Sequence, residues 1–192
     1  MKKCARYLKG KPRQVQRYPM QERPKQLTAY SDSDFAGCLQ SRKSTTCSMI
    51  FYGRHLLRGS STTQGVIALS SGEAEFYAAV KTASLSLGMK AMMADLGVTM
   101  TTPIALRVDS TACMGAAGRR GAGKIRHIAT GTLWIQRAVS EGRIALQKVL
   151  GTKNPADIGT KVLGGAVFDS IVKQSGFMNL QGTSAIALKA AV

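Results

Sequence analysis

Acidic side chains are scarce in this chain, so the position of each one is informative. Only 10 of the 192 residues are Asp or Glu, against 27 Lys and Arg. Asp32 lies on a predicted strand, Asp109 ends a second strand, and Asp157 follows a loop at the start of a predicted helix. Glu73 and Glu75 lie two residues apart on a predicted helix, about 200° around its axis, so only one of them can face a given site.

Carboxylates that converge from separate elements would form a candidate metal site. Three or four of them in one shallow site repel each other, and a divalent cation relieves that repulsion. Mg²⁺ takes hard oxygen ligands and keeps water molecules for a phosphate substrate. Two such ions about 4 Å apart can activate water and stabilise the leaving oxygen in phosphodiester hydrolysis. Surface acids are also common without a metal, so the spacing alone leaves both interpretations open.

The charge balance points to a polyanionic partner. The formal net charge is +17 and the sequence pI is about 10.2. Small proteins this basic usually meet nucleic acid, and a generally basic surface without a specific partner is the alternative. A hydrophobic content of 44% is sufficient for a core, and the length suits one domain with extensions.

Cysteine usage and hydropathy argue against several other classes of protein. No two cysteines have CxxC spacing and only two histidines are present, which argues against a zinc site. The cysteines are expected to be thiols in a reducing compartment. No run of about 18 apolar residues predicts a membrane span, and the N-terminus lacks the apolar region of a secretory signal. The four cysteines are Cys4, Cys38, Cys47 and Cys113.

Three segments are predicted along the chain. Residues 1–27 hold nine Lys and Arg and one acid, Glu22, and are interpreted as a basic arm that follows phosphates. A solvated tail and an organelle-targeting segment are the alternatives for this arm. Residues 28–163 form the main domain, and residues 164–192 form a C-terminal helix and tail.

Periodicity and turn residues predict the order β-β-β-α-β-α-α-β-α, which favours a mixed sheet covered by helices. Ser70 and Glu73 have the spacing of a capping box at the start of the longest helix. Strands are predicted at 27–37, 45–52, 55–58, 103–108 and 143–150, and helices at 73–96, 110–117, 133–139, from 156, and at 168–177, with a further short one possible at 2–8.

Basic residues in two loops are candidates for contact with phosphate. The glycine-rich loop at 118–126 is the stronger candidate, with a solvated loop as the alternative. Arg42 and Lys43 lie in a turn near Asp32 and are expected to touch backbone phosphate. Trp134 is expected in the core rather than as a platform for a base, and His127 is expected to be structural rather than catalytic. The basic residues of the 118–126 loop are Arg119, Arg120, Lys124 and Arg126.

Six motifs in order carry a family resemblance. They are YSDSDFAG at 30–37, SRKST at 41–45, ALSSGEAEFYA at 68–78, LRVDS at 106–110, RHI at 126–128 and NPADIGTK at 154–161. Together they resemble the ribonuclease H domain of copia-type LTR-retrotransposon polyproteins, over about residues 6–178. The segment RYLKG at 6–10 resembles the end of the connection that precedes this domain.

The resemblance implies an α/β fold, a ribonuclease H-like five-stranded mixed sheet with three antiparallel strands followed by parallel ones and helices on both faces. It also implies Mg²⁺-dependent cleavage of the RNA strand in RNA–DNA hybrids, with 2′-hydroxyl groups marking the RNA. The catalytic and metal-binding acids carried over are Asp32, Glu75 rather than Glu73, Asp109 and Asp157. Asp34 then becomes a supporting or structural acid.

The sequence departs from the family at three places. His127-Ile128 is followed by Ala-Thr-Gly, where the family usually has an acidic and a basic residue. A second histidine is replaced near Leu133-Trp134, and no histidine precedes Asp157. These changes leave the four acids intact and affect substrate handling and product release.

Two functions are therefore carried forward. The first is an active hybrid-directed endonuclease. The second is a recruited, non-catalytic RNA-binding subunit of a ribonucleoprotein particle such as an organellar ribosome, with structured RNA and other particle proteins as partners. Met1 lies within the connection-like region, which fits either a stand-alone gene or an artificial boundary. The expected location is intracellular, in a cytoplasmic particle or, for a recruited subunit, in mitochondria.

Overall fold

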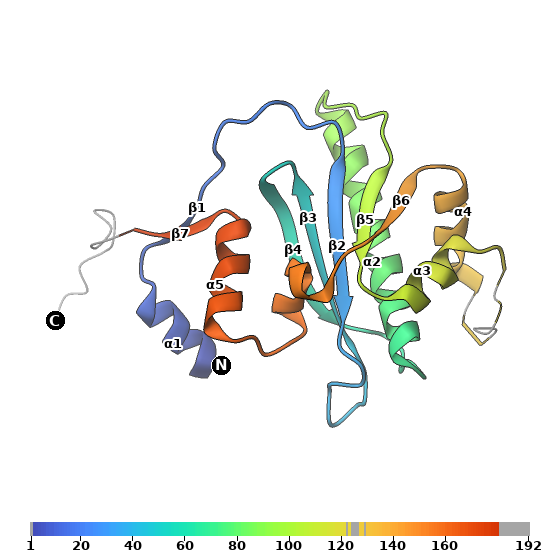
Figure 1. The fold of residues 1–192 in the computed structure, drawn as a ribbon, viewed down its shortest axis with the longest axis horizontal. Helices are drawn as coiled ribbons and strands as arrows, with labels where there is room; N and C mark the ends of the chain where they lie inside the picture. Colours follow the sequence, from blue (N-terminus) through green and yellow to red (C-terminus); the bar gives the residue numbers. More distant parts are fainter. Residues whose placement is uncertain (1, 122, 124–126, 129, 181–192) are drawn as a thin grey trace.

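A five-stranded mixed sheet forms the centre of the computed structural model, which describes residues 2–121, 123, 127–128 and 130–180. The strand order is β4-β3-β2-β5-β6, with β2, β3 and β4 antiparallel and β2, β5 and β6 parallel (Figure 1). This confirms the predicted fold class. The strands are β2 (Leu27–Ser33), β3 (Thr45–Tyr52), β4 (His55–Thr63), β5 (Ile104–Val108) and β6 (Ile144–Lys148).

The hairpin of β3 and β4 follows from local chemistry. Residues 45–52 combine β-branched and aromatic side chains, which favour a half-buried strand. Gly53 has a φ of +61°, which a two-residue hairpin turn requires and which glycine adopts without steric cost. The bounds of β3 match the prediction, whereas β4 runs to Thr63 instead of Arg58 because its pairing with β3 continues to Thr45.

The parallel pair β2–β5 places the ends of two strands side by side. Its register joins Thr28 to Ala105 and Tyr30 to Arg107. Asp32 lies two residues beyond Tyr30, and Asp109 lies two residues beyond Arg107. Because parallel strands run in the same direction, this register brings both acids to the same end of the sheet, where β2 and β5 finish.

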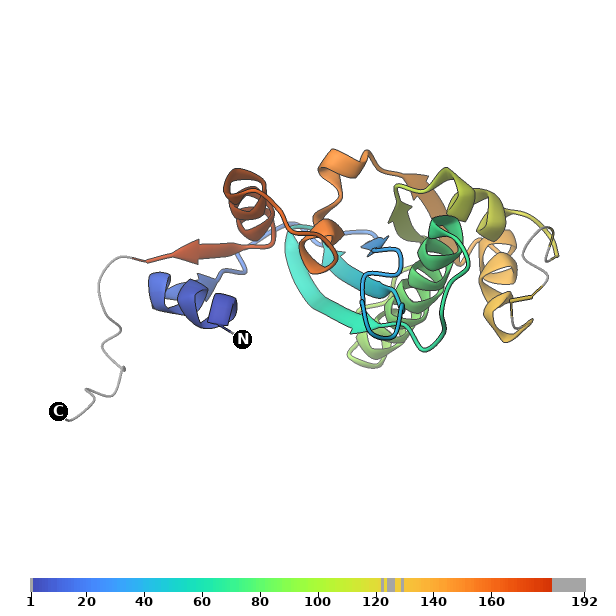
Figure 2. The ribbon, with the colours of Figure 1, turned by 90° about the horizontal axis from the view of Figure 1, so that it is seen from below.

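Helical elements cover both faces of the sheet (Figure 2). The long helix α2 (Ser71–Asp95) packs its Phe76 against Leu27, Ala29 and Ile50 on one face. The other face holds a smaller apolar cluster around Tyr30, which the short 3₁₀ helix η3 (Pro155–Gly159) helps to close. The other helical elements are α3 (Thr111–Gly118), η1 (Thr130–Thr132), α4 (Trp134–Ser140), η2 (Gly151–Lys153) and α5 (Gly165–Gln174).

The N-terminal segment packs against the C-terminal elements. Helix α1 (Lys2–Gly10) places Tyr7 edge-on to Phe168 of α5, with ring centroids 5.4 Å apart. Strand β1 (Gln14–Gln16) pairs with β7 (Phe177–Asn179), and neither strand was predicted. Residues 2–17 therefore lie beside α5, on the left of Figure 1.

Several predicted bounds are corrected. Strand β2 ends at Ser33, not at residue 37, because the Asp34 carboxylate accepts a hydrogen bond from the Thr45 amide and Ala36 turns to a φ of +54°. The helix predicted from residue 156 is a 3₁₀ helix, and the last helix spans 165–174 instead of 168–177. In the part of the chain that is described, no helix has the length and apolar character that crossing a membrane requires.

Candidate active site

Three of the predicted acids lie close together at the ends of β2 and β5. Asp32 lies on β2, Glu75 on the first turns of α2, and Asp109 directly after β5. One carboxylate oxygen from each lies within 4.8 Å of those from the other two. Glu75 lies 43 positions after Asp32 and 34 positions before Asp109 in the sequence. The sheet and the helix that packs on it bring the three residues together.

The start of α2 decides which glutamate faces the cluster. The Ser70 hydroxyl caps the helix by accepting from the Glu73 amide at 3.2 Å. The Glu73 carboxylate turns away, accepting from the Leu69 amide at 3.0 Å and lying 2.9 Å from His127 Nε2. Glu75 points to the strand ends, where its Oε1 accepts from the Ser33 amide at 3.3 Å.

Electrostatic strain is concentrated on Glu75. Burial raises the pKa of Glu75 to about 8, and the nearby charges of Asp32 and Asp109 add to the rise. Its Oε2 is buried and has no hydrogen-bond partner among the described residues. Burial also raises the pKa of Asp32, although Thr160 and Lys161 oppose the shift. An unpartnered carboxylate oxygen inside a group of three acids is a fitting ligand for a hard cation.

Asp157 joins the site indirectly, through a lysine. The Lys161 ammonium lies 2.8 Å from Asp157 Oδ1 and 3.2 Å from Asp32 Oδ1. Burial works against the charged form of Lys161, but the two carboxylates outweigh it and raise the lysine pKa. Asp157 lies outside the three-acid cluster, and Lys161 was not predicted. The four-residue spacing of Asp157 and Lys161, which favours an ion pair, was the available signal.

The segment around η3 is anchored to β2 and β3, which holds Asp157 near the other acids. The Asn154 side chain donates to the Ser31 carbonyl at 3.0 Å and accepts from the Ala156 amide at 3.2 Å. A Cβ on Gly159 would stand 2.5 Å from Cys47 Sγ, so only glycine permits this close approach to β3.

The predicted phosphate-binding residues that the structure describes lie in loops. Arg42 and Lys43 belong to the loop between β2 and β3, beyond the strand end that carries Asp32 (Figure 1). Arg119 and Arg120 follow the end of α3. Lys124 and Arg126 lie outside the described residues, so the contact of all four loop residues with phosphate stays a prediction.

Trp134 takes the core position predicted for it, and His127 and Asp34 make contacts that stabilise the fold. Trp134 packs, partly buried, against the main hydrophobic core. His127 pairs with the buried Glu73 and does not belong to the three-acid cluster. Asp34 also has a structural role, since its carboxylate closes the turn before Thr45.

Comparison with known sequences finds that the chain is similar to Pol polyproteins of plant retrotransposons. It is 28% identical over 137 residues to the retrovirus-related Pol polyprotein from transposon TNT 1-94 of Nicotiana tabacum, a match that covers 71% of this chain and 10% of the relative. It is 28% identical over 177 residues to that from transposon RE1 of Arabidopsis thaliana, covering 92% of this chain and 12% of the relative. The chain is a homologue of copia-type retrotransposon Pol polyproteins.

This homologue spans about a tenth of the length of the curated relatives that it matches. No family model matches it. Among solved structures it is similar to the N-terminal RNase H domain of a Mycobacterium tuberculosis protein, with 15% identity, a TM-score of 0.48, and coverage of 78% of this chain and 98% of the other. A second is an RNase H1 isolated from compost, with 14% identity, a TM-score of 0.47, and coverage of 79% and 96%.

Proposed function

We propose that the protein is a Mg²⁺-dependent endonuclease that cleaves the RNA strand of RNA–DNA hybrids. The single observation that carries this proposal is the cluster of Asp32, Glu75 and Asp109, whose carboxylate oxygens lie within 4.8 Å of one another. The buried Oε2 of Glu75, which has no hydrogen-bond partner among the described residues, supports a divalent cation as the ligand of this cluster. The homology to Pol polyproteins supports nucleic acid as the substrate.

The three acids would hold Mg²⁺ between the ends of β2 and β5 and the start of α2. When bound, Mg²⁺ supplies an activated water and neutralises charge at the cleaved phosphate. The structure restricts the movement of two of these acids. Asp32 is fully buried on its strand, and the Ser33 amide fixes one oxygen of Glu75. The protein thus keeps the ligands in place before substrate arrives, which avoids reorganisation during the reaction.

Asp157 and Lys161 complete the proposed site from its outer side. Only 14% of the Asp157 side chain is exposed, against 42% of the Lys161 side chain. Lys161 neutralises part of the repulsion between Asp157 and Asp32. We propose that Asp157 orients water at the cleaved phosphate while Lys161 holds the Asp157 carboxylate toward Asp32.

Substrate binding would rely on the strongly basic composition. A net charge of +17 attracts the phosphate backbone of either strand. Arg42 and Lys43, at the same end of the sheet as the acids, and Arg119 and Arg120 are the proposed backbone contacts. Such contacts position the nucleic acid without reading its sequence, and recognition of 2′-hydroxyl groups would select the RNA strand.

The test is cleavage of an end-labelled RNA–DNA hybrid by the purified protein in Mg²⁺. We expect cleavage by the unaltered chain, loss of cleavage in EDTA, and loss in Asp32→Asn. Asp95→Asn is the matched control, because Asp95 is an exposed acid at the far end of α2. Cleavage that persists in Asp32→Asn would overturn the assignment of the site. Tight hybrid or RNA binding without any cleavage would instead favour the recruited RNA-binding subunit.

A further inference from the structure

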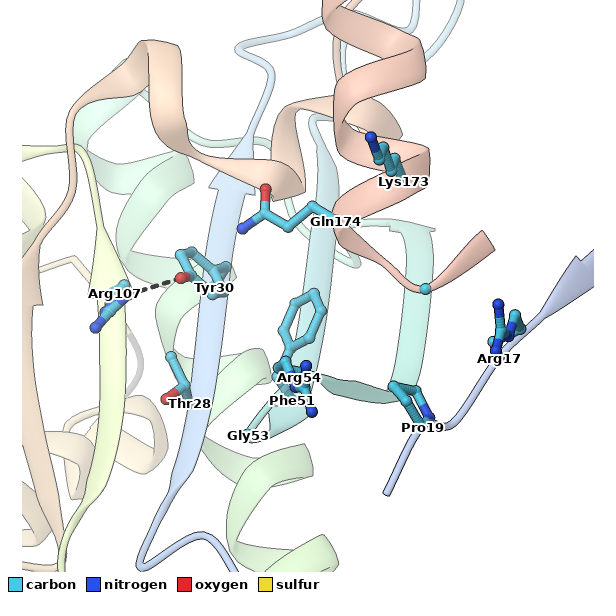
Figure 3. A pocket seen from close by; sticks show the side chains of 11 residues that line it. Arg17, Pro19, Thr28, Tyr30, Phe51, Gly53, Arg54, Arg107, Lys173 and Gln174 are labelled. Atoms are coloured by element: carbon cyan, nitrogen blue, oxygen red, sulfur yellow. Dashed lines mark hydrogen bonds between the residues drawn. The ribbon is translucent and has the colours of Figure 1, made fainter. Parts of the chain in front are cut away.

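A cavity lies on the sheet face that carries Tyr30. The cavity has a volume of about 490 Å³ and opens between β2, β3 and β5, the end of α5 and the segment before β2 (Figure 3). Its size is that of a site for a small organic ligand. Its 11 lining residues include Arg17, Tyr30, Phe51, Arg54, Arg107 and Lys173.

The charge of this cavity is of one sign. Four of the 11 lining residues are Arg or Lys, whereas the whole chain holds 27 in 192, and none of the 11 is acidic. In the described part of the chain, Arg17, Arg54, Arg107 and Lys173 form no ion pair with a carboxylate. Four cations around one cavity repel each other, so an anion that enters it relieves the repulsion.

Arg107 is held in place before any ligand binds. Its Nη1 donates to the Tyr30 hydroxyl at 2.7 Å and its Nε donates to Gln147 Oε1 at 3.2 Å. The guanidinium carbon lies 5.4 Å from the centre of the Tyr30 ring. Both protein partners are neutral, so the positive charge is oriented but not cancelled. A charge fixed in this way loses little conformational entropy when it binds an anion.

The floor of the cavity is aromatic. Tyr30 and Phe51 meet edge to face with ring centroids 5.7 Å apart, and Thr28 lies beside them on β2. Gln174 extends from α5 toward Tyr30, Arg54 lies beside Phe51, and Lys173 and Arg17 lie farther out, on α5 and on the segment before β2 (Figure 3). The site therefore combines cations around its rim with an apolar base, which suits a ligand that has an anionic part and a ring.

We propose that this cavity binds one nucleoside phosphate unit. The phosphate is held by Arg107 and Lys173, with Arg54 and Arg17 as further cations, and the sugar or base lies over Tyr30 and Phe51. Guanidinium groups bind phosphate through paired, charge-assisted hydrogen bonds. The phosphate belongs either to a nucleic-acid strand or to a free nucleotide, and the experiment below distinguishes these sources.

The cavity is separate from the acidic cluster. Tyr30 and Arg107 each stand two residues before an acid of the cluster, on the same face of their strands. Two residues advance a strand by about 7 Å, and none of the three acids lines the cavity. Binding here needs neither metal nor cleavage, and the inference goes beyond the proposed function.

Calorimetric titration in EDTA tests the proposal with three probes: inorganic phosphate, AMP and a short single-stranded DNA. The unaltered chain is compared with Arg107→Gln/Lys173→Gln. The control, Arg58→Gln/Lys81→Gln, removes the same charge from two exposed residues of β4 and α2 that do not line the cavity. We expect AMP affinity to fall at least about tenfold in the cavity variant and to change less than about twofold in the control.

The outcomes separate the possible sources and the possible failures. Binding of AMP shows that a free nucleotide suffices, whereas binding of DNA alone assigns the cavity to a strand backbone. Equal losses in both double variants, or no binding of any probe by the unaltered chain, would overturn the proposal. Lys173→Gln alone, on the exposed side of α5, gives a second variant if loss of Arg107 disturbs folding. Titration of Asp109→Asn separates the two sites, since we expect it to bind AMP normally whether or not the protein is a nuclease.

Discussion

The acidic cluster and the basic cavity occupy successive stretches of the same two strands. On β2, Tyr30 precedes Asp32, and on β5, Arg107 precedes Asp109. The acidic cluster gathers carboxylates whose charge Lys161 only partly offsets, whereas the cavity gathers cations that form no ion pair with a carboxylate in the described part of the chain. Among the residues that the structure describes, the cluster leaves a carboxylate oxygen of Glu75 without a hydrogen-bond partner, whereas the cavity orients the Arg107 guanidinium with neutral groups. The same two strands thus carry two groups of like charges of opposite sign, the cations along the face of Tyr30 and the acids at the strand ends, where α2 adds Glu75.

The depth of the charges also differs between the two regions. Asp32 is fully buried, so repulsion within the cluster is poorly screened and adds to the rise in the Glu75 pKa that burial causes. Lys173 and Arg54 of the cavity are exposed, and water screens their mutual repulsion. Loss of charge should therefore affect folding stability at the cluster and mainly ligand affinity at the cavity. The following predictions test that contrast, starting with the largest expected effect.

Asp109→Asn should separate catalysis from binding. Replacing groups that only support metal ligands typically costs 10- to 100-fold, so loss of a direct ligand should reduce hybrid cleavage by more than about 100-fold. Binding of AMP should be unchanged, because Asp109 does not line the cavity. Single-turnover cleavage and calorimetry measure the two effects. A parallel loss of both would show that the regions are one site.

Glu75→Gln should stabilise the metal-free protein at high pH. The Glu75 pKa is about 8 in the folded protein, against about 4.5 when unfolded. Between these values the folded state holds a proton that the unfolded state has released, so stability falls as pH rises from about 4.5 to 8. At pH 8 the variant should be more stable by on the order of 2 kcal/mol.

Urea unfolding in EDTA at pH 5, 6.5 and 8 measures this effect. The difference between Glu75→Gln and the unaltered protein should grow with pH. Glu22→Gln is the control, because Glu22 is exposed in the segment before β2. Parallel curves of unfolding free energy against pH for the unaltered protein and Glu75→Gln would contradict the raised pKa of Glu75.

The salt dependence of DNA binding should change more when cations of the cavity are removed than when other exposed cations are removed. Each phosphate contact in a single strand contributes roughly 0.7 to the slope of log affinity against log salt. Arg107→Gln/Lys173→Gln should therefore lower the slope by about 1.4, whereas Arg58→Gln/Lys81→Gln should lower it less. Fluorescence anisotropy of a labelled single-stranded DNA in EDTA measures the slope. Equal slopes for the two double variants would show that the cavity cations make no backbone contact.

Lys161→Met should have the smallest effect on stability. It should lower the stability of the metal-free protein slightly and strengthen cation binding. The ammonium group bridges Asp32 and Asp157, but its side chain is 42% exposed. Solvent screening limits the cost of its loss to on the order of 1 kcal/mol. The net charge of the site then becomes more negative by one, because a positive charge is lost. Mg²⁺ should therefore raise the melting temperature more in the variant than in the unaltered protein. Thermal melts with and without Mg²⁺ check this, and an equal rise in both would contradict it.

Much of the fold could be predicted because local chemistry agrees with it. The β-branched and aromatic run at 45–52 produced the observed bounds of β3, and Ser70 caps α2 as its position before Glu73 indicated. The resemblance and the helical spacing together selected Glu75 over Glu73. Strands β1 and β7 were not predicted because each has only three residues and is defined by pairing with the other, across the length of the chain.

The sequence by itself determined which chemical groups are present and in what order: the scarce acids, the excess of basic residues and the alternation that makes strands. Only the tertiary structure decided which of them meet. Lys161 lies between two carboxylates because η3 docks on β3 at Gly159, and Arg107 contacts Tyr30 because β2 and β5 pair in parallel at that register. Both contacts join residues far apart in the chain, and their geometry depends on strand register and close packing, which no local pattern specifies.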